Sequence, residues 1–258
     1  MNKITKAFQG HKAFVAFITG GDPDFETTEN LIAAMSEAGV DIIEIGIPFS
    51  DPIAEGIVIQ EADKRALSKG CTVDKLFDMV KRVREKVSIP LLFMGYINSI
   101  FVYGKERFME KCKGCGIDGV IVPDLPFDEK DEISDACGKY CITLISLIAP
   151  TSHERTKAIA KDSEGFIYCV SSLGVTGMRS AINTDIAEMI TQAKGVSSTP
   201  CAIGFGISNT AQAREMAALS DGVIVGSAIV KLVAEYGREC IEPVTQFVRA
   251  MSDAIKNV

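Results

Sequence analysis

The sequence lacks three features that would mark a membrane, secreted or nucleic-acid-binding protein. It has no apolar run near the roughly 18 residues that a membrane-spanning helix needs. Its first residues, MNKITKAFQGHK, are not followed by the apolar segment and small-residue cleavage site of a secretory signal. The basic residues are scattered, and 27 Lys and Arg are outnumbered by 34 Asp and Glu, giving a formal net charge of −7. We therefore expect a soluble, cytoplasmic protein that binds neither membranes nor nucleic acid.

Linkers are absent as well. No segment rich in proline, glycine or serine divides the chain, and no low-complexity segment occurs. The length of 258 residues suits one α/β barrel, since such barrels run to about 250 residues as one unit. We expect a single domain over residues 1–258.

Eight cysteines are present, and without an export signal we interpret them as reduced, buried thiols. The spacing of Cys112 and Cys115, followed by Cys137 and Cys141, also resembles a four-thiolate zinc site. Buried free cysteine is common in protein cores, so we predict no metal here and keep zinc as the alternative.

Eight short apolar segments alternate with longer amphipathic ones. Several are uninterrupted, which is typical of parallel strands covered on both faces, and the helical patterns between them suit βαβ crossovers. The expected strands are Ala13–Thr19, Ile42–Ile45, Leu91–Met94, Val120–Val122, Thr143–Leu147, Phe166–Val170, Cys201–Ile203 and Val223–Val225. We predict an α/β fold, a single (β/α)8 TIM barrel with extra helical segments; a doubly wound open sheet is the alternative.

Two expected loops are unusually long. Gly46–Gly70 follows the second strand and includes an extra helical stretch, and Ser171–Asn183 follows the sixth strand. In a barrel, both loops lie at the carboxyl ends of the strands, where active sites form. Elsewhere Ser208 is placed to cap a helix. The expected helices include Glu26–Ala38, Thr72–Glu85 and Thr210–Leu219.

Glu44 is a carboxylate inside the apolar run Ile42–Ile45. Strand alternation places Ile42 and Glu44 on one face and the isoleucines at 43 and 45 on the other, so Glu44 is expected to point into the barrel. Burial would raise its pKa, which suits a general acid and base. The alternative is a structural glutamate with a partner elsewhere in the chain.

A second carboxylate, Glu55, lies in the loop after this strand, close to Asp51. Two carboxyl groups that reach one pocket can take opposite roles when their environments differ. Tyr168 repeats the pattern of a polar-tipped side chain within an apolar strand. A surface charge and a core tyrosine are the alternative interpretations of these two residues.

Glycines follow the last two expected strands. The sequence GFG occupies positions 204–206, and Gly226 precedes Ser227 at the start of a helical segment, Ala228–Ala234. Barrels often build a phosphate site from the loops after strands seven and eight, where glycines expose backbone N–H groups at a helix N-terminus. We predict a phosphate site there, with Gly177 as a further contact.

Several motifs together resemble one known family. The segments FITGGDPD, IIEIGIPFSDPIAEG, IVPDLPFDE, GFIYCVSSLGVTG, GFGIS and DGVIVGSAIV resemble the tryptophan synthase alpha subunit in order, spacing and total length. The resemblance implies a (β/α)8 barrel that cleaves indole-3-glycerol phosphate to indole and glyceraldehyde 3-phosphate by a retro-aldol reaction. It also implies a subunit without its own cofactor, docked on a pyridoxal-phosphate beta subunit in an αββα heterotetramer through which indole passes.

The resemblance also assigns roles to residues. Glu44 matches the acid and base that protonates the indole ring, and Glu55 matches the second carboxylate, which hydrogen-bonds the indole N–H. Tyr168 matches an active-site tyrosine, and Thr176 matches a loop threonine that closes over the substrate. The phosphate site corresponds to Gly177, Gly206, Gly226 and Ser227. The aromatic part of the substrate corresponds to a pocket at Phe17, Met94, Tyr96 and Phe205.

The chain departs from the family pattern at one place. The usual ADGP is replaced by Ala54, Glu55, Gly56 and Ile57. The acid gains a methylene and the loop loses a proline, so the carboxyl group moves by roughly 1 Å, which can cost on the order of 100-fold in rate. Two alternatives therefore stay open: a catalytically weakened barrel that acts mainly as an allosteric partner of the beta subunit, and a stand-alone lyase that releases indole.

Overall fold

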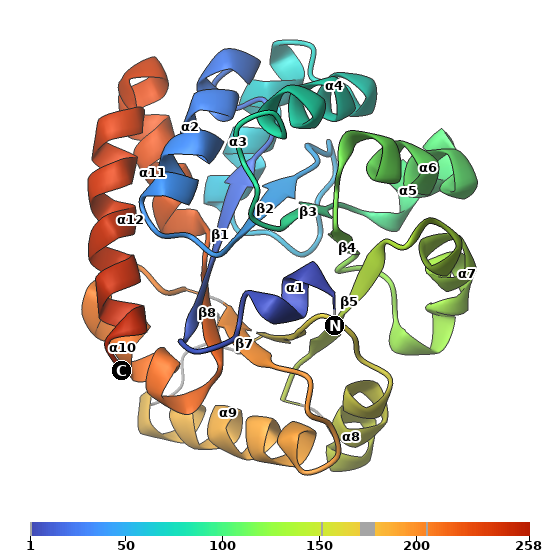
Figure 1. The fold of residues 1–258 in the computed structure, drawn as a ribbon, viewed down its shortest axis with the longest axis vertical. Helices are drawn as coiled ribbons and strands as arrows, with labels where there is room; N and C mark the ends of the chain where they lie inside the picture. The colour runs from blue at the N-terminus through green and yellow to red at the C-terminus, as the bar shows by residue number, and fades with distance from the viewer. Residues whose placement is uncertain (1, 151, 171–178, 205) are drawn as a thin grey trace.

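Eight parallel strands form a closed barrel in the computed structural model, which describes residues 2–150, 152–170, 179–204 and 206–258. Each strand pairs with its neighbour in chain order, and β8 closes on β1 (Figure 1). The strands are β1 Ala13–Thr19, β2 Ile42–Gly46, β3 Leu91–Met94, β4 Gly119–Ile121, β5 Thr143–Ile148, β6 Ile167–Val170, β7 Cys201–Gly204 and β8 Gly222–Val225. The predicted barrel is confirmed, and the open-sheet alternative is wrong.

Helices surround the barrel, except α1, which lies across one end of it (Figure 1). They are α1 Lys3–Lys6, α2 Phe25–Glu37, α3 Ile57–Ser68, α4 Val73–Val83, α5 Ile97–Tyr103, α6 Lys105–Cys115, α7 Asp131–Tyr140, α8 His153–Lys161, α9 Arg179–Lys194, α10 Thr210–Leu219, α11 Ser227–Tyr236 and α12 Ile241–Lys256, with 3-10 turns η1 Phe127–Glu129 and η2 Gly237–Glu239. The extra helical stretch expected after the second strand is α3. No helix in the described part of the chain is long and apolar enough to cross a membrane.

The strands separate two apolar cores because successive side chains point to opposite faces. Inside the barrel lie residues such as Val15, Ile42 and Leu92. Between the barrel and the helices lie residues such as Ile43 and Ile45, which belong to the larger core. The alternation predicted for the second strand is therefore confirmed.

The N-terminal helix closes the amino end of the barrel. Ile4 of α1 is buried among the interior residues, and the ring of Phe8 lies 5.5 Å from that of Phe166. The hydroxyl of Thr5 donates to the carbonyl of Gly165 at 3.1 Å. With this end filled, a substrate can enter the interior only from the carboxyl ends of the strands.

Two local predictions differ from the structure. The helix α10 is capped by Asn209, whose side chain accepts from the N–H of Gln212 at 3.0 Å, whereas Ser208 bonds to the side chain of Gln212. An Asx side chain is an equally good cap, so the sequence offered two adjacent candidates. The loop expected over Ser171–Asn183 is also shorter than predicted, since α9 begins at Arg179.

Candidate active site

Glu44 lies inside the barrel, two residues before Gly46, where the ladder between β2 and β3 ends. Its Cα is in register with Phe17 of β1 and Leu92 of β3. The side chain is fully buried, and neither carboxyl oxygen has a hydrogen-bond partner among the described residues. Burial raises the pKa of Glu44 from 4.5 to about 8. The carboxyl group is therefore mostly protonated at neutral pH and can donate a proton.

Phe17 fills the space beside Glu44 because two glycines make room for its ring. A Cβ atom placed on Gly46 would lie 2.6 Å from the ring, and one on Gly226 would lie 3.2 Å from the Phe17 Cβ. Met94 contacts the barrel interior and also the small cluster that contains Phe17. Three of the predicted pocket and phosphate residues, Phe17, Met94 and Gly226, thus come together at the barrel mouth.

Tyr168 faces the same interior from β6. The negative charge of Glu44 is the second cause, after burial, of a strong rise in the pKa of Tyr168. The hydroxyl lies against Gly204, where a Cβ atom would be only 2.6 Å from the oxygen. A neutral phenol therefore lies close enough to Glu44 to sense its charge, as a shared substrate pocket requires.

Glu55 is held at the rim by Tyr96, which follows β3. The Tyr96 hydroxyl donates to Glu55 Oε2 at 2.7 Å and accepts from the N–H of Ala54 at 2.8 Å. The Tyr96 ring also stacks on Phe49 from the same loop, with ring centres 5.1 Å apart. Partial burial raises the pKa of Glu55, the Tyr96 bond opposes this, and the charge of Asp124 adds to the rise. The longer acid is anchored rather than free in solvent.

Isoleucine replaces the family's proline at a position where proline is favoured but not required. Ile57 is the first residue of α3, after the N-cap Gly56. Proline is favoured at that position because the first N–H groups of a helix have no intrahelical partner, but it is not required there. Helix α3 begins here with isoleucine in its place.

Two further residues near the site were not predicted. Asp63 of α3 is only 4% exposed, and burial followed by the charge of Glu55 raises its pKa to about 7. Its place between Ala62 and Ala66 on the buried side of α3 is the helical spacing that could have identified it. Thr19, two residues after Phe17, has a buried hydroxyl without a partner in the described chain.

The expected phosphate site has two described parts. Gly226 is the N-cap of α11 and supplies no capping side chain, so the first N–H groups of that helix, beginning at Ser227, lack a side-chain acceptor. Gly206 has a positive φ of 68°, and a Cβ atom there would meet nothing within 4 Å. An uncapped helix start beside an open glycine turn is suited to an anion.

Three predicted residues lie outside the described part of the chain. Thr176 and Gly177 belong to positions 171–178, and Phe205 lies between Gly204 and Gly206. Their predicted roles in loop closure, phosphate binding and aromatic contact stay predictions.

The four thiols considered for zinc are not gathered into a site. Cys112 and Cys137 are buried in the helix-facing core, with the Cys137 sulfur 3.8 Å from that of Met109. Cys141 is exposed at the end of α7. Among the residues that the structure describes, no three histidine, cysteine or acidic side chains are arranged to hold a metal ion.

The fold and the site define a class of protein: a (β/α)8 barrel with a buried carboxyl group and a helix start without a side-chain cap at its open mouth. The chain belongs to the tryptophan synthase alpha chain family, whose sequence model matches residues 4–256. The alpha chain from Caldanaerobacter subterraneus subsp. tengcongensis is 47% identical, over 99% of this chain and all of that protein. The family is that of an enzyme subunit.

Solved structures of relatives have the same fold. The alpha subunit from Legionella pneumophila is 34% identical over the full length of both chains, with a TM-score of 0.90. A chain from the tryptophan synthase α2β2 complex of Pyrococcus furiosus is 37% identical over 93% of this chain and 98% of its own, with a TM-score of 0.85.

Proposed function

We propose that this chain is a carbon–carbon lyase that cleaves indole-3-glycerol phosphate to indole and glyceraldehyde 3-phosphate. The observation that carries the proposal is Glu44, a buried carboxyl group at the mouth of the barrel with no hydrogen-bond partner in the described part of the chain. A pKa of about 8 keeps a proton on this group at neutral pH. General acid and base catalysis requires a group that can both give and take a proton near the working pH.

One carboxyl group can serve both proton transfers of the cleavage. Glu44 gives its proton to the ring carbon that bears the glycerol chain, which leaves a positive charge shared with the ring nitrogen. The Glu44 carboxylate then takes the proton of the adjacent glycerol hydroxyl. As the carbonyl of the aldehyde forms, the carbon–carbon bond breaks and its electron pair returns to the ring, so Glu44 ends protonated again.

Glu55 supports the charged intermediate. Its carboxylate would accept a hydrogen bond from the indole N–H and offset the positive charge on the ring. The Tyr96 hydroxyl, 2.7 Å from Glu55 Oε2, holds this carboxylate at the rim. Phe17, Met94 and Tyr168 would surround the aromatic ring.

The phosphate of the substrate would bind at the start of α11. Ser227 and Gly226 offer N–H groups there, and no acidic residue lies in the first turn of the helix. We expect Gly226→Asp to raise KM by at least about 100-fold, because a negative side chain would face the phosphate dianion. The side chain would also crowd Phe17, and the disturbed packing would weaken substrate binding further. Gly226→Ala is the matched control for crowding without charge. An unchanged KM in Gly226→Asp would place the phosphate elsewhere.

A beta subunit is the expected partner, in an αββα heterotetramer. The loop face carries exposed apolar side chains that a partner would cover: Ile53 and Val102 are each 82% exposed, and Phe101 is 46% exposed. They follow the adjacent strands β2 and β3. This chain is expected to bind no cofactor; pyridoxal phosphate would be held by the beta subunit, which receives the indole.

An indole-release assay tests the proposal and separates it from its two alternatives. The isolated chain and its complex with a beta subunit are each given indole-3-glycerol phosphate. We expect measurable cleavage by the chain alone and faster cleavage in the complex. Cleavage without any binding to a beta subunit would favour the stand-alone lyase. Binding that activates the beta subunit without cleavage would favour the weakened, allosteric barrel.

A further inference from the structure

The outer wall of the barrel has a gap at β5. In the described strands, the side chains that face the helices are buried, with two exceptions on β5, Leu144 and Ser146. Helices α7 and α8 lie on either side of this strand (Figure 1). A cavity of about 420 Å³ lies between them, within the usual size range of small-molecule pockets.

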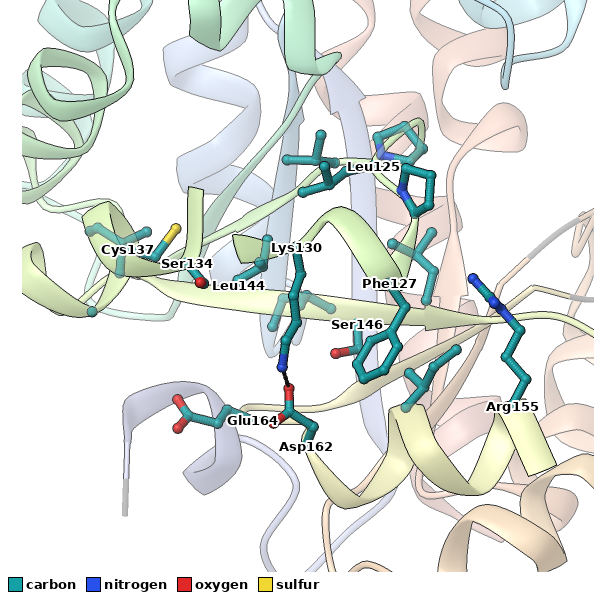
Figure 2. A pocket seen from close by; sticks show the side chains of 18 of the residues that line it. Leu125, Phe127, Lys130, Ser134, Cys137, Leu144, Ser146, Arg155, Asp162 and Glu164 are labelled. Carbon is teal, nitrogen blue, oxygen red and sulfur yellow. Dashed lines mark hydrogen bonds and ion pairs between the residues drawn. The ribbon is translucent and has the colours of Figure 1, made fainter. Parts of the chain in front are cut away.

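Apolar side chains form part of the lining of this cavity, and polar and charged side chains form much of the rest. Leu125, Phe127, Leu144 and Ile159 lie around it, with Ser146 on its β5 wall (Figure 2). The Ser146 side chain is half-buried at this wall. An apolar pocket with a few placed polar groups is the usual form of a site that orients a small ligand.

The charges at the rim pair with one another. Lys130 bonds to Asp162 across the gap, as Figure 2 shows, and Arg155 pairs with Asp128 at 2.9 Å. Both pairs join the segment before α7 to α8. The lining cations are therefore already neutralised within the described chain, and an anionic ligand would have to displace a carboxylate. The carboxylate of Glu164, also in the lining, would repel an anion further.

We propose that this cavity binds a small, uncharged aromatic molecule that donates one N–H to the Ser146 hydroxyl. Phe127, which lies between Lys130 and Arg155 in Figure 2, contributes its ring to the lining, with the Lys130 ammonium 4.9 Å from the ring centre. Indole has this chemistry, and the choice of indole as the physiological ligand rests on the proposed function. The cavity would then hold the product outside the barrel, on a surface separate from Glu44.

Methyl NMR of the full chain, titrated with indole, tests the site. The chain contains no tryptophan, so indole fluorescence gives an independent binding signal without background. We expect saturable shifts of the Leu125, Leu144 and Ile159 methyl signals. Ser146→Phe should abolish these shifts, and Ser134→Phe, which fills the cavity from α7, should do the same if the first variant fails to fold.

Two smaller substitutions test the hydrogen bond. Ser146→Ala should weaken binding at the cavity about fivefold, the loss expected for one neutral hydrogen bond. Ser134→Ala is the matched control: its hydroxyl contacts Asp131 at 3.4 Å, so affinity should not change. Indole-3-acetate, which is an anion, should shift the cavity signals far less than indole.

Several outcomes would overturn the inference: no shift of the cavity signals up to the solubility limit of indole, the same affinity in a correctly folded Ser146→Phe, or equal binding of indole-3-acetate. The Met94 methyl reports the barrel mouth separately. Because binding is measured without turnover, a failure at the cavity alongside normal indole release removes this inference alone. A failure of indole release alongside cavity binding removes the proposed function alone.

Discussion

Three aspartates at the amino end of the barrel and two glutamates at its carboxyl end have opposite surroundings. At the amino end, Asp41, Asp118 and Asp221 each accept a backbone N–H from a neighbouring strand and pair with a cation. At the carboxyl end, Glu44 has no partner among the described residues, and Glu55 has a phenol instead of a cation. Paired acids stabilise a fold, whereas unpaired buried acids destabilise it and hold protons that chemistry can use.

The amino end shows how the pairing works. Asp118 Oδ2 accepts from the N–H of Leu91, the first residue of β3, at 3.0 Å. The same oxygen pairs with Arg84, whose guanidinium also donates to the carbonyl of Gly116 at 2.8 Å. Lys3 from α1 adds a third contact at 3.3 Å. These bonds connect Asp118 with β3, with Arg84 and with the N-terminal helix α1.

The largest expected effect is a loss of kcat when Glu44, at the carboxyl end of the barrel, is replaced. Glu44→Gln keeps the shape of the side chain but cannot transfer a proton, so kcat should fall by about 10²–10⁴-fold. Steady-state indole release with a beta subunit present measures it, and a circular dichroism melting curve checks the fold. Near-normal turnover by the folded variant would remove Glu44 from the mechanism.

The same residue should set how stability depends on pH. Its pKa rises from 4.5 to about 8 on folding. Below pH 4.5 both states hold the proton, so the raised pKa takes nothing from stability; as pH rises toward 8 the unfolded chain alone releases the proton, so stability falls. At about pH 7 this cost is on the order of 3 kcal/mol, and Glu44→Gln should remove it.

Urea unfolding of both proteins at several pH values measures this difference. The variant should be the more stable protein near pH 7, and the gap should close as pH falls toward 4.5. A gap of constant size across this range would mean that Glu44 does not titrate with a raised pKa.

Replacing a paired aspartate at the amino end should have the opposite result: lower stability and unchanged catalysis. Asp118→Ala leaves the Arg84 guanidinium and the N–H of Leu91 without their acceptor, so stability should fall by about 2 kcal/mol. Asp118→Asn, which can still accept from Leu91, should lose less. Denaturant unfolding measures the loss, and kcat and KM of the folded protein should stay the same. A change in kcat without a loss of stability would contradict the separation of the two ends.

The difference between the ends also limits what the sequence could predict. All eight strands were predicted to within one residue at each end, because each is a short, mostly apolar run between amphipathic segments, and Glu44 stood out as the charge within one of them. The pairing of Asp41 with Lys256 joins residues far apart in the chain and exists only because the barrel closes. The helical spacing of Asp63 on the buried side of α3 could have identified it, but the effect of the Glu55 charge on its pKa depends on the folded loop.

The smallest expected effect is on kcat/KM when Glu55, where the chain departs from its family, is shortened to aspartate. If the pocket is built for the longer acid, Glu55→Asp withdraws the carboxyl group from the Tyr96 hydroxyl, and kcat/KM should stay level or fall by less than about 10-fold. If the longer acid has weakened the enzyme, the shorter one should restore the geometry, most of all together with Ile57→Pro. The single and double variants are compared in the presence of a beta subunit, with Tyr96→Phe as the control for the lost hydrogen bond. A rise of about 10-fold, worth about 1.4 kcal/mol of transition-state stabilisation, would show that Glu55 is not the competent second carboxylate.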